Sequence, residues 1–216
     1  MKNMENDSLE ARLLKSYEYL EISNEQRESI NTYLNLIKYR DIETYEHSIR
    51  VGLKGEEVAE FTHIIEPKGL FYPGLLHDVG KALTNPKSLK KKIGFDDKDK
   101  KELKKHPIDG YRILRGVHDF SARVLLYHHW FQEHGYPEHI PHPDVDWSKG
   151  SEAMIMISAR ILSVIDFYDA ATTRKNDKFV SGVIETPDKD KIKEAILKHN
   201  PDQEYLINQL YNQGIF

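Results

Sequence analysis

The chain has 216 residues, enough for one domain with a sizeable core, and with 39% hydrophobic and 31% charged residues it contains no apolar run of the roughly 18 residues that a membrane helix needs. A net charge of −4 gives no reason to expect binding to long nucleic acid. No cysteine is present and the first residues, MKNMENDSLE, lack the apolar stretch of a secretory signal, so we expect a cytoplasmic protein that does not span a membrane.

Hydrophobic periodicity indicates helices along most of the chain. Apolar residues recur three and four positions apart, and the alternation that is typical of strands is scarce, so the sequence predicts an all-α fold. Asp96 is expected to cap one helix, and Pro107 to open the next. The predicted helices cover, in chain order, residues 9–20, 30–37, about 42–61, 75–82, 96–105, 107–129, 152–172, 188–199 and 202–211.

Two segments between these helices differ from the rest. The segment 81–105 is dense in lysine and could attract a phosphate-bearing substrate, although a solvated surface explains the same composition. Glycines and prolines punctuate residues 130–150 and predict a long loop, a feature that often carries function.

Eleven histidines are many for this length, and several accompany acidic residues. His77 and Asp78 lie inside the apolar run GLLHDVGK, where an unpaired charge would cost several kcal/mol. A bound metal would remove that cost, and an ion pair at the helix end is the alternative.

Helical spacing suggests how other residues could reach the same ions. Glu43 and His47 lie four residues apart, hence on one face of a helix. His128 and His129 are adjacent, so their side chains diverge by about 100° and favour two metals over one.

Two further positions offer ligands of the same types. His106 precedes Pro107, and Asp166 lies in the most apolar predicted helix, which we expect to be central and buried. Each residue taken alone has an ordinary explanation, such as a surface histidine or a carboxylate bonded to a backbone amide, but together they favour a metal site. The candidate ligands are Glu43, His47, His77, Asp78, His106, His128, His129 and Asp166.

The order of these residues resembles the HD superfamily of metal-dependent phosphohydrolases, and within it the HD-GYP branch. The resemblance covers about residues 42–174, while the loop run HHWFQEHGYP is one residue shorter than the branch pattern, has Trp130 where the branch has an acidic residue, and is followed by a longer insertion. The motifs that carry it are ETYEHSIRV at 43–51, HDVGK at 77–81, HPIDG at 106–110, the histidine pair at 128–129 and DFYDA at 166–170.

The resemblance implies an HD-domain helical bundle, which we place at residues 41–216. The apolar periodicity of residues 1–40 predicts a helical hairpin packed on this bundle. It also implies a metal-dependent phosphohydrolase with two or three divalent ions, and the imidazole-rich ligands suit iron or manganese better than magnesium. The implied ligand sets are His47, His77, Asp78 and Asp166 for one ion, Asp78 again with His106, His128 and His129 for a second, and Glu43 for a third.

The implied reaction is hydrolysis of a phosphate ester, and for this branch the substrate is a cyclic dinucleotide, cyclic di-GMP. Asp78 would bridge the ions, and Lys81, about one helical turn later, would hold a phosphate oxygen as a point charge. Arg50 would either bind phosphate or pair with a carboxylate. Tyr136 or Trp130 would offer a face for a base to stack on, unless this segment is an ordinary turn.

Other functions remain open at this point. An HD enzyme could act on a nucleoside phosphate or another phosphate monoester. A nucleotide-binding receptor without activity could keep the same metals, and a diiron oxygenase could use the same helical scaffold.

Overall fold

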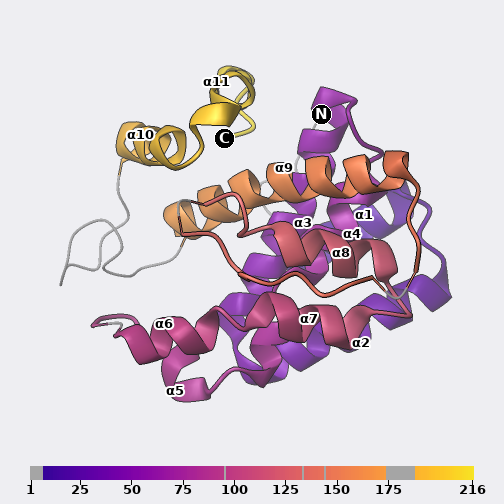
Figure 1. The fold of residues 1–216 in the computed structure, drawn as a ribbon. Coiled ribbons are helices and arrows are strands. Elements are labelled where there is room, and N and C mark those ends of the chain that lie inside the picture. Colours follow the sequence, from indigo (N-terminus) through magenta and orange to yellow (C-terminus); the bar gives the residue numbers. More distant parts are fainter. Residues whose placement is uncertain (1–6, 95, 133, 144, 174–187) are drawn as a thin grey trace.

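The computed structural model describes residues 7–94, 96–132, 134–143, 145–173 and 188–216. Within these ranges all regular secondary structure is helical, which confirms the predicted all-α fold. Figure 1 shows the helices α2 to α8 gathered below the long helix α9, with α10 and α11 above it. None of the described helices is both long and apolar enough to cross a membrane.

The chain begins with a helical hairpin, as expected. Helices α1 (Leu9–Tyr19) and α2 (Asn24–Arg40) are separated by a turn, and Ser23 forms a capping box with Gln26 at the start of α2. Both helices contribute buried side chains to one hydrophobic cluster that continues into α3, α4, α7 and α8. The hairpin therefore shares its core with the helices that follow, and the division at residue 40 stays a prediction.

Helices α3 (Ile42–Thr62) and α4 (Lys68–Leu76) cross at very short range. The contact depends on two glycines: a Cβ on Gly74 would lie 2.7 Å from the Cα of Gly52, closer than real Cβ atoms approach. This crossing brings His47 on α3 near His77, which directly follows α4.

The helix expected around residues 75–82 is interrupted. The chain leaves the α-helix at His77 and Asp78 and continues as a 3-10 helix, η1 (Val79–Leu83). Gly80 in η1 packs against α7 (His106–Leu114), where an added Cβ would collide with the carbonyl oxygen of His106. The interruption thus places Asp78 beside the start of α7.

The middle of the chain consists of short helices. Helix α5 spans Pro86–Leu89, and α6 spans Asp97–Leu103 with the predicted cap at Asp96. Helix α7 begins one residue before Pro107, and α8 spans Asp119–Tyr127. Residues 130–148 contain no helix in their described part, in agreement with the predicted loop.

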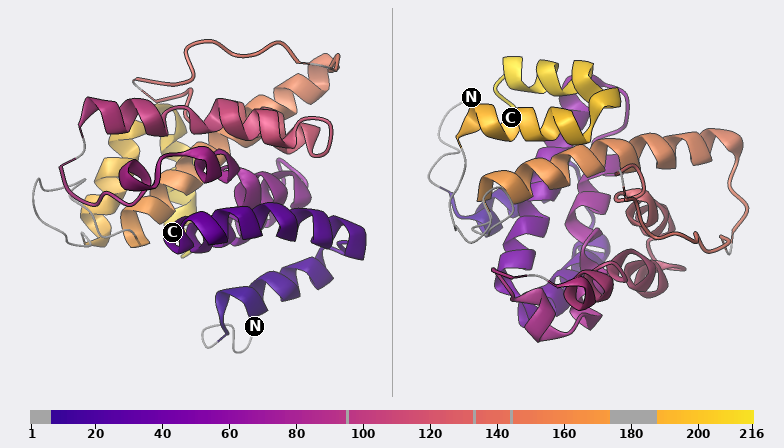
Figure 2. Two further views of the ribbon diagram at one scale, coloured as in Figure 1. Left: turned by 90° about the horizontal axis from the view of Figure 1, so that it is seen from below. Right: turned by 60° about the vertical axis from the view of Figure 1, so that its left-hand side comes forward.

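Helix α9 (Lys149–Thr173) is central and largely buried, as its sequence predicted. Helices α10 (Lys189–His199) and α11 (Glu204–Asn212), with the 3-10 turn η2 (Pro201–Gln203) between them, pack on the side of α9 that faces away from α2 and α7 (Figure 2). Arg160 of α9 holds them through a bidentate ion pair with Asp202, with distances of 2.6 and 2.9 Å, and a hydrogen bond to Asn200.

Candidate metal centre

Seven of the eight predicted ligands converge in the interior. They come from five places in the fold: α3, the break between α4 and η1, the start of α7, the residues just after α8, and the middle of α9. All are at most 9% exposed, a rare environment for a group of ionisable side chains. They are His47, His77, Asp78, His106, His128, His129 and Asp166.

One group of these ligands forms around Asp166. The Nε2 atom of His47 lies 3.0 Å from Asp166 Oδ1 and 3.3 Å from His77 Nε2. The distance from His77 Nε2 to the same carboxylate oxygen is 3.7 Å. Three potential ligand atoms therefore surround one point.

A second group lies on the other side of Asp78. His106 Nε2 is 3.4 Å from His128 Nε2, and with His129 these rings place three nitrogens within 4.8 Å of one another. Asp78 faces both groups, because its Oδ1 lies 3.5 Å from His106 Nε2 and its Oδ2 lies 3.4 Å from His77 Nε2. A carboxylate in this position has the geometry to bridge two ions.

The hydrogen bonds of the histidines fit a metal site. Nδ1 of His77, His106 and His128 each faces a backbone carbonyl oxygen at 2.8, 2.7 and 2.5 Å, so Nδ1 must carry the hydrogen and donate it. In the neutral ring this leaves a lone pair on Nε2, directed into the cluster. A cation placed between such lone pairs would satisfy them.

His129 differs from the other rings. The side-chain nitrogen of Gln132 lies 3.0 Å from its Nδ1. If the Gln132 amide is turned round, its oxygen accepts from Nδ1 and frees Nε2 as in the other rings.

Burial and the neighbouring carboxylates shift the pKa values of the clustered histidines in different directions. Burial lowers the pKa of His128 to about 4 and holds the pKa values of His106 and His129 well below the usual range. Burial also acts to lower the pKa of His77, but the carboxylates of Asp78 and Asp166 outweigh it and raise the pKa to about 9. These two carboxylates thus favour positive charge beside His77, which a bound cation would also supply.

Comparison with known proteins identifies the family. The family model described as the HD domain matches residues 44–171, more than half of the chain. The chain belongs to the HD domain family.

Curated relatives of this HD domain protein match over a larger part of the chain. It is 30% identical over 179 residues to the cyclic di-GMP phosphodiesterase response regulator RpfG of Xanthomonas campestris, a match that covers 76% of the chain and 42% of the relative. It is 30% identical over 151 residues to a cyclic di-GMP phosphodiesterase of Thermotoga maritima, a match that covers 66% of the chain and 38% of the relative. A cyclic di-GMP phosphodiesterase of Pseudomonas aeruginosa is 29% identical over 151 residues, a match that covers 66% of the chain and 34% of the relative. The chain thus spans well under half the length of these relatives.

A carboxylate outside the ligand cluster orients one histidine of this HD domain. Asp169, one helical turn after Asp166, accepts a hydrogen bond of 2.7 Å from His47 Nδ1 and is held by Arg50 through bonds of 2.8 and 3.0 Å. The ion pair that the sequence left open for Arg50 is therefore present. Sequence reasoning had not assigned Asp169 to the site, although its position three residues after Asp166 on one helix face was the available signal.

Lys81 contacts the bridging carboxylate. Its Nζ donates to Asp78 Oδ2 over 2.6 Å, and its side chain is 11% exposed. The 3-10 geometry of η1 brings residues three apart onto one side, which explains the contact. Lys81 therefore lies at the edge of the cluster, where it also lowers the pKa values of Asp78 and His106.

The structure does not bring Glu43 into the cluster. Its side chain is 58% exposed and pairs with Lys92. Because α3 begins at Ile42, Glu43 lies in the solvent-facing first turn while His47, one turn later, is buried. Glu43 and His47 do lie four residues apart on one helix, as predicted, but only the side chain of His47 is buried.

Tyr136 lies against the histidines. Its ring stacks on His129, with centroids 4.6 Å apart and an interplanar angle of 27°, and meets His106 edge-on at 6.0 Å. Trp130, the other predicted stacking residue, is 46% exposed and packs on Tyr127 and Phe131 instead. Tyr136 is thus the aromatic residue next to the HD cluster.

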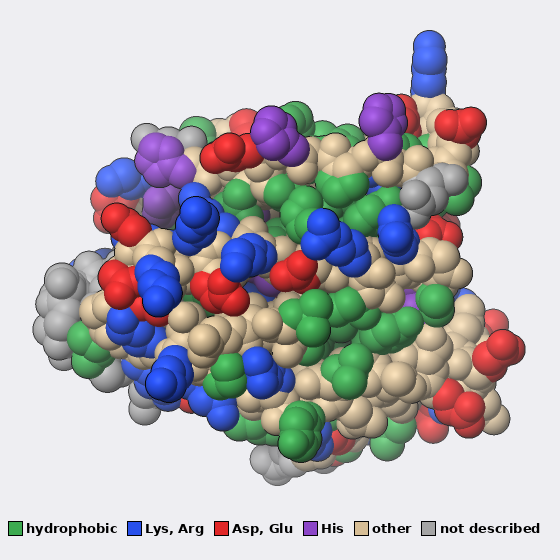
Figure 3. Space-filling model, turned by 60° about the horizontal axis from the view of Figure 1, so that its bottom comes forward, with side chains coloured by type: hydrophobic (Ala, Val, Ile, Leu, Met, Phe, Trp, Pro, Cys, Tyr) green, Lys and Arg blue, Asp and Glu red, His purple; other side chains and the backbone are tan. Residues whose placement is uncertain are grey.

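The surroundings of the cluster carry mixed charge. On the face in Figure 3, lysine and arginine side chains alternate with acidic ones. Several lysines of the segment 81–105 are ion-paired, among them Lys91 with Asp99 and Lys105 with Glu102.

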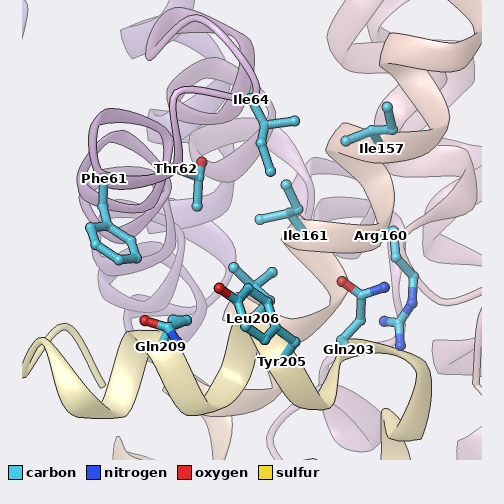
Figure 4. A pocket seen from close by; sticks show the side chains of 10 residues that line it. All are labelled: Phe61, Thr62, Ile64, Ile157, Arg160, Ile161, Gln203, Tyr205, Leu206 and Gln209. Atoms are coloured by element: carbon cyan, nitrogen blue, oxygen red, sulfur yellow. The ribbon is translucent and has the colours of Figure 1, made fainter.

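A separate cavity of about 390 Å³ contains none of the predicted site residues (Figure 4). It opens between the end of α3, α9 and α11, and its lining is mostly apolar. Ile157 and Ile161 line it from α9, nearly opposite Asp166 around that helix.

Proposed function

We propose that the chain is a metal-dependent phosphohydrolase that hydrolyses cyclic di-GMP. The observation that carries this proposal is the pair of buried histidine groups joined by Asp78, whose two oxygens face one group each. A second support is the printed function of the three curated relatives, each of which is named a cyclic di-GMP phosphodiesterase.

The proposed metal ligands form two sets. His47, His77, Asp78 and Asp166 would hold one ion, and Asp78 with His106, His128 and His129 would hold the other. Imidazole-rich sites of this kind favour iron or manganese. When bound, the ions would activate water and neutralise charge on the phosphoryl oxygens. A third ion at Glu43 would require that side chain to leave Lys92.

Residues beside the ions would position the substrate. Lys81 would neutralise a non-bridging phosphate oxygen at the edge of the cluster, where its ammonium already contacts Asp78. Tyr136 would offer the exposed part of its ring to a guanine base. Asp169 and Arg50 would act through His47 and keep its ring in the ligating orientation.

The experiment that tests this function starts with protein purified without chelator. We expect two ions per chain by elemental analysis, and conversion of cyclic di-GMP to the linear dinucleotide or GMP when iron or manganese is supplied. Activity on phosphate monoesters but not on cyclic di-GMP would assign another HD substrate. Tight binding of cyclic di-GMP without turnover would assign a receptor, and oxygen consumption with a polyol substrate would assign an oxygenase. The cytoplasmic location remains a prediction.

A further inference from the structure

Lys104 differs from several neighbouring lysines in what its side chain contacts. Lys91, Lys92 and Lys105 pair with carboxylates, whereas among the described residues no carboxylate lies within ion-pairing distance of Lys104. Its Nζ lies over the ring of Tyr136, 5.2 Å from the centroid. The ammonium is therefore not committed to an acidic partner in this part of the chain.

The position of Lys104 is fixed by the same turn that presents a ligand. Lys104 ends α6, where its backbone N–H donates to carbonyl oxygens of that helix. Two residues later, His106 begins α7 and donates from Nδ1 to the carbonyl oxygen of Leu103. The cation and the ligand are thus held on one short, hydrogen-bonded segment.

Lys104, Tyr136 and His129 form a path from the surface to the cluster. The ring of Tyr136 contacts Lys104 at 5.2 Å and stacks on His129 at 4.6 Å, and His129 is buried. A ligand that stacks on Tyr136 and reaches the proposed ions with one part would bring another part to the ammonium of Lys104, on the side of Tyr136 away from the cluster.

We infer that Lys104 binds the second phosphate of a cyclic dinucleotide, the one that is not being hydrolysed. This inference rests on the proposed function. A cyclic dinucleotide carries two phosphodiester groups, and only one can occupy the metal centre at a time. Lys81 lies at the cluster, where the first phosphate would bind, whereas Lys104 lies over Tyr136 farther out, so we assign the other phosphate to Lys104. A substrate with a single phosphate would gain nothing from it.

The test compares Lys104→Ala with Lys105→Ala in the full-length chain loaded with manganese. Lys105 is a matched control because it is the next residue, removes the same charge, and pairs with Glu102 away from Tyr136. Initial rates would be measured on cyclic di-GMP and on bis(p-nitrophenyl) phosphate, which has one phosphate. Circular dichroism and metal content would show that both variants fold and retain their ions.

For Lys104→Ala we expect KM for cyclic di-GMP to rise about tenfold, the size expected for loss of one charge-assisted contact. The ratio of kcat/KM for cyclic di-GMP to kcat/KM for bis(p-nitrophenyl) phosphate should fall by a similar factor, and Lys104→Arg should restore this ratio. Added salt should raise KM of the wild type more than that of Lys104→Ala. Lys105→Ala should keep the wild-type ratio.

An unchanged substrate ratio in Lys104→Ala, or an equal loss in Lys105→Ala, would overturn the inference. So would a wild-type protein that neither hydrolyses nor binds cyclic di-GMP. In that case the proposed substrate would fail as well, and hydrolysis of bis(p-nitrophenyl) phosphate would leave only a phosphohydrolase of another specificity. Hydrolysis of cyclic di-GMP with an unchanged ratio in Lys104→Ala would instead overturn the inference alone, which separates the two failures.

Discussion

Asp78 is the carboxylate that faces both groups of proposed ligands. Its oxygens face His77 on one side and His106 on the other, and its side chain is fully buried. We predict that Asp78→Ala lowers the metal content from two ions to one or none and abolishes hydrolysis, because the bridge between the ions is lost. Elemental analysis and product separation measure both. Asp109→Ala, at a half-buried position on α7, is the control that should keep metal and activity, and full activity of Asp78→Ala would refute the site.

Asp169 acts on the ions only through His47. Asp169→Asn keeps the shape of the side chain but weakens the charge-assisted bond to His47 Nδ1. We predict a loss of metal affinity of about 10- to 100-fold with folding preserved, measured by metal titration in a competing chelator. Lys191→Ala, at an exposed site, should leave the affinity unchanged. Equal affinity in Asp169→Asn and wild type would contradict a role for the Asp169 charge in orienting His47.

Most of the site could be predicted at the scale of single residues. Residue type and order were enough to name His77, Asp78 and Asp166, because each is an ionisable group in an apolar segment. Depth was not predictable for Glu43, since the start of α3 at the surface depends on how that helix packs. The spacing of Asp169 from Asp166 placed it on the same helix face, but its partner could not be predicted, because His47 lies 122 residues away in sequence.

At the scale of elements, the contact between η1 and α7 sets the distance between Asp78, which precedes η1, and His106, which begins α7. Gly80→Ala would place a methyl group against the carbonyl oxygen of His106 and 2.6 Å from Gly110 N. We predict a loss of roughly 1–3 kcal/mol in the free energy of unfolding, typical of overpacking, together with lower metal content. Denaturant titration and elemental analysis measure the two effects. Gly150→Ala is the control, because its added Cβ would meet only Ser148 Oγ at 3.8 Å. Wild-type stability of Gly80→Ala would mean that η1 can shift freely.

The interface between α1 and α3 contains a carboxylate that opposes folding at neutral pH. Burial raises the pKa of Glu56, Ser16 partly offsets this, and Glu60 adds to the rise. Since the folded state holds the proton more tightly, the stability that this group contributes is lost as pH rises through its folded-state pKa. We predict that Glu56→Gln raises Tm at pH 7 and that the gain disappears below the ordinary glutamate pKa.

Thermal melts of Glu56→Gln and wild type at several pH values test this. Glu25→Gln, at the exposed start of α2, is the matched control and should show no such pH-dependent gain. A gain in Tm that is the same at pH 4 and pH 7 would contradict the assignment of the effect to the charge of Glu56.

The elements themselves were largely predictable, and the main departure has a tertiary cause. The hairpin, α3, α9 and the cap at Asp96 follow from periodicity and capping residues. The break at His77 and Asp78 does not, because the local apolar pattern is equally compatible with a continuous helix. The 3-10 turn is stabilised by the close contact of Gly80 with α7, which no local pattern encodes.

At the scale of the whole molecule, the cluster joins two hydrophobic cores. One core contains buried residues of α1, α2, α3, α4, α7 and α8, and the other is built mainly from α9, α10 and α11, with further residues of α3, α4 and α8. Asp166 lies on α9, whereas His77 and His128 adjoin α4 and α8 of the first core. Bound ions would therefore link both cores.

Metal removal should accordingly destabilise the entire fold. At free metal about 1,000-fold above Kd, each ion contributes about 4 kcal/mol, which corresponds to a Tm rise of about 8–16 °C per ion for a chain of this size. Scanning calorimetry of chelated and manganese-loaded protein measures the difference. Magnesium serves as the control cation and should give a much smaller rise. Equal melting of the chelated and loaded forms would contradict a site that spans the two cores.

Three of the proposed ligand histidines share one local arrangement. His77, His106 and His128 each donate Nδ1–H to the carbonyl oxygen three residues earlier, at the end of a helix or turn. The direction of each ring is thus encoded in four consecutive residues. We expect changes outside these tetrapeptides to leave the Nδ1 hydrogen bonds that set each ring direction intact. Changes in the loop before α9 that keep Tyr136 against His129 would therefore leave these three rings in place.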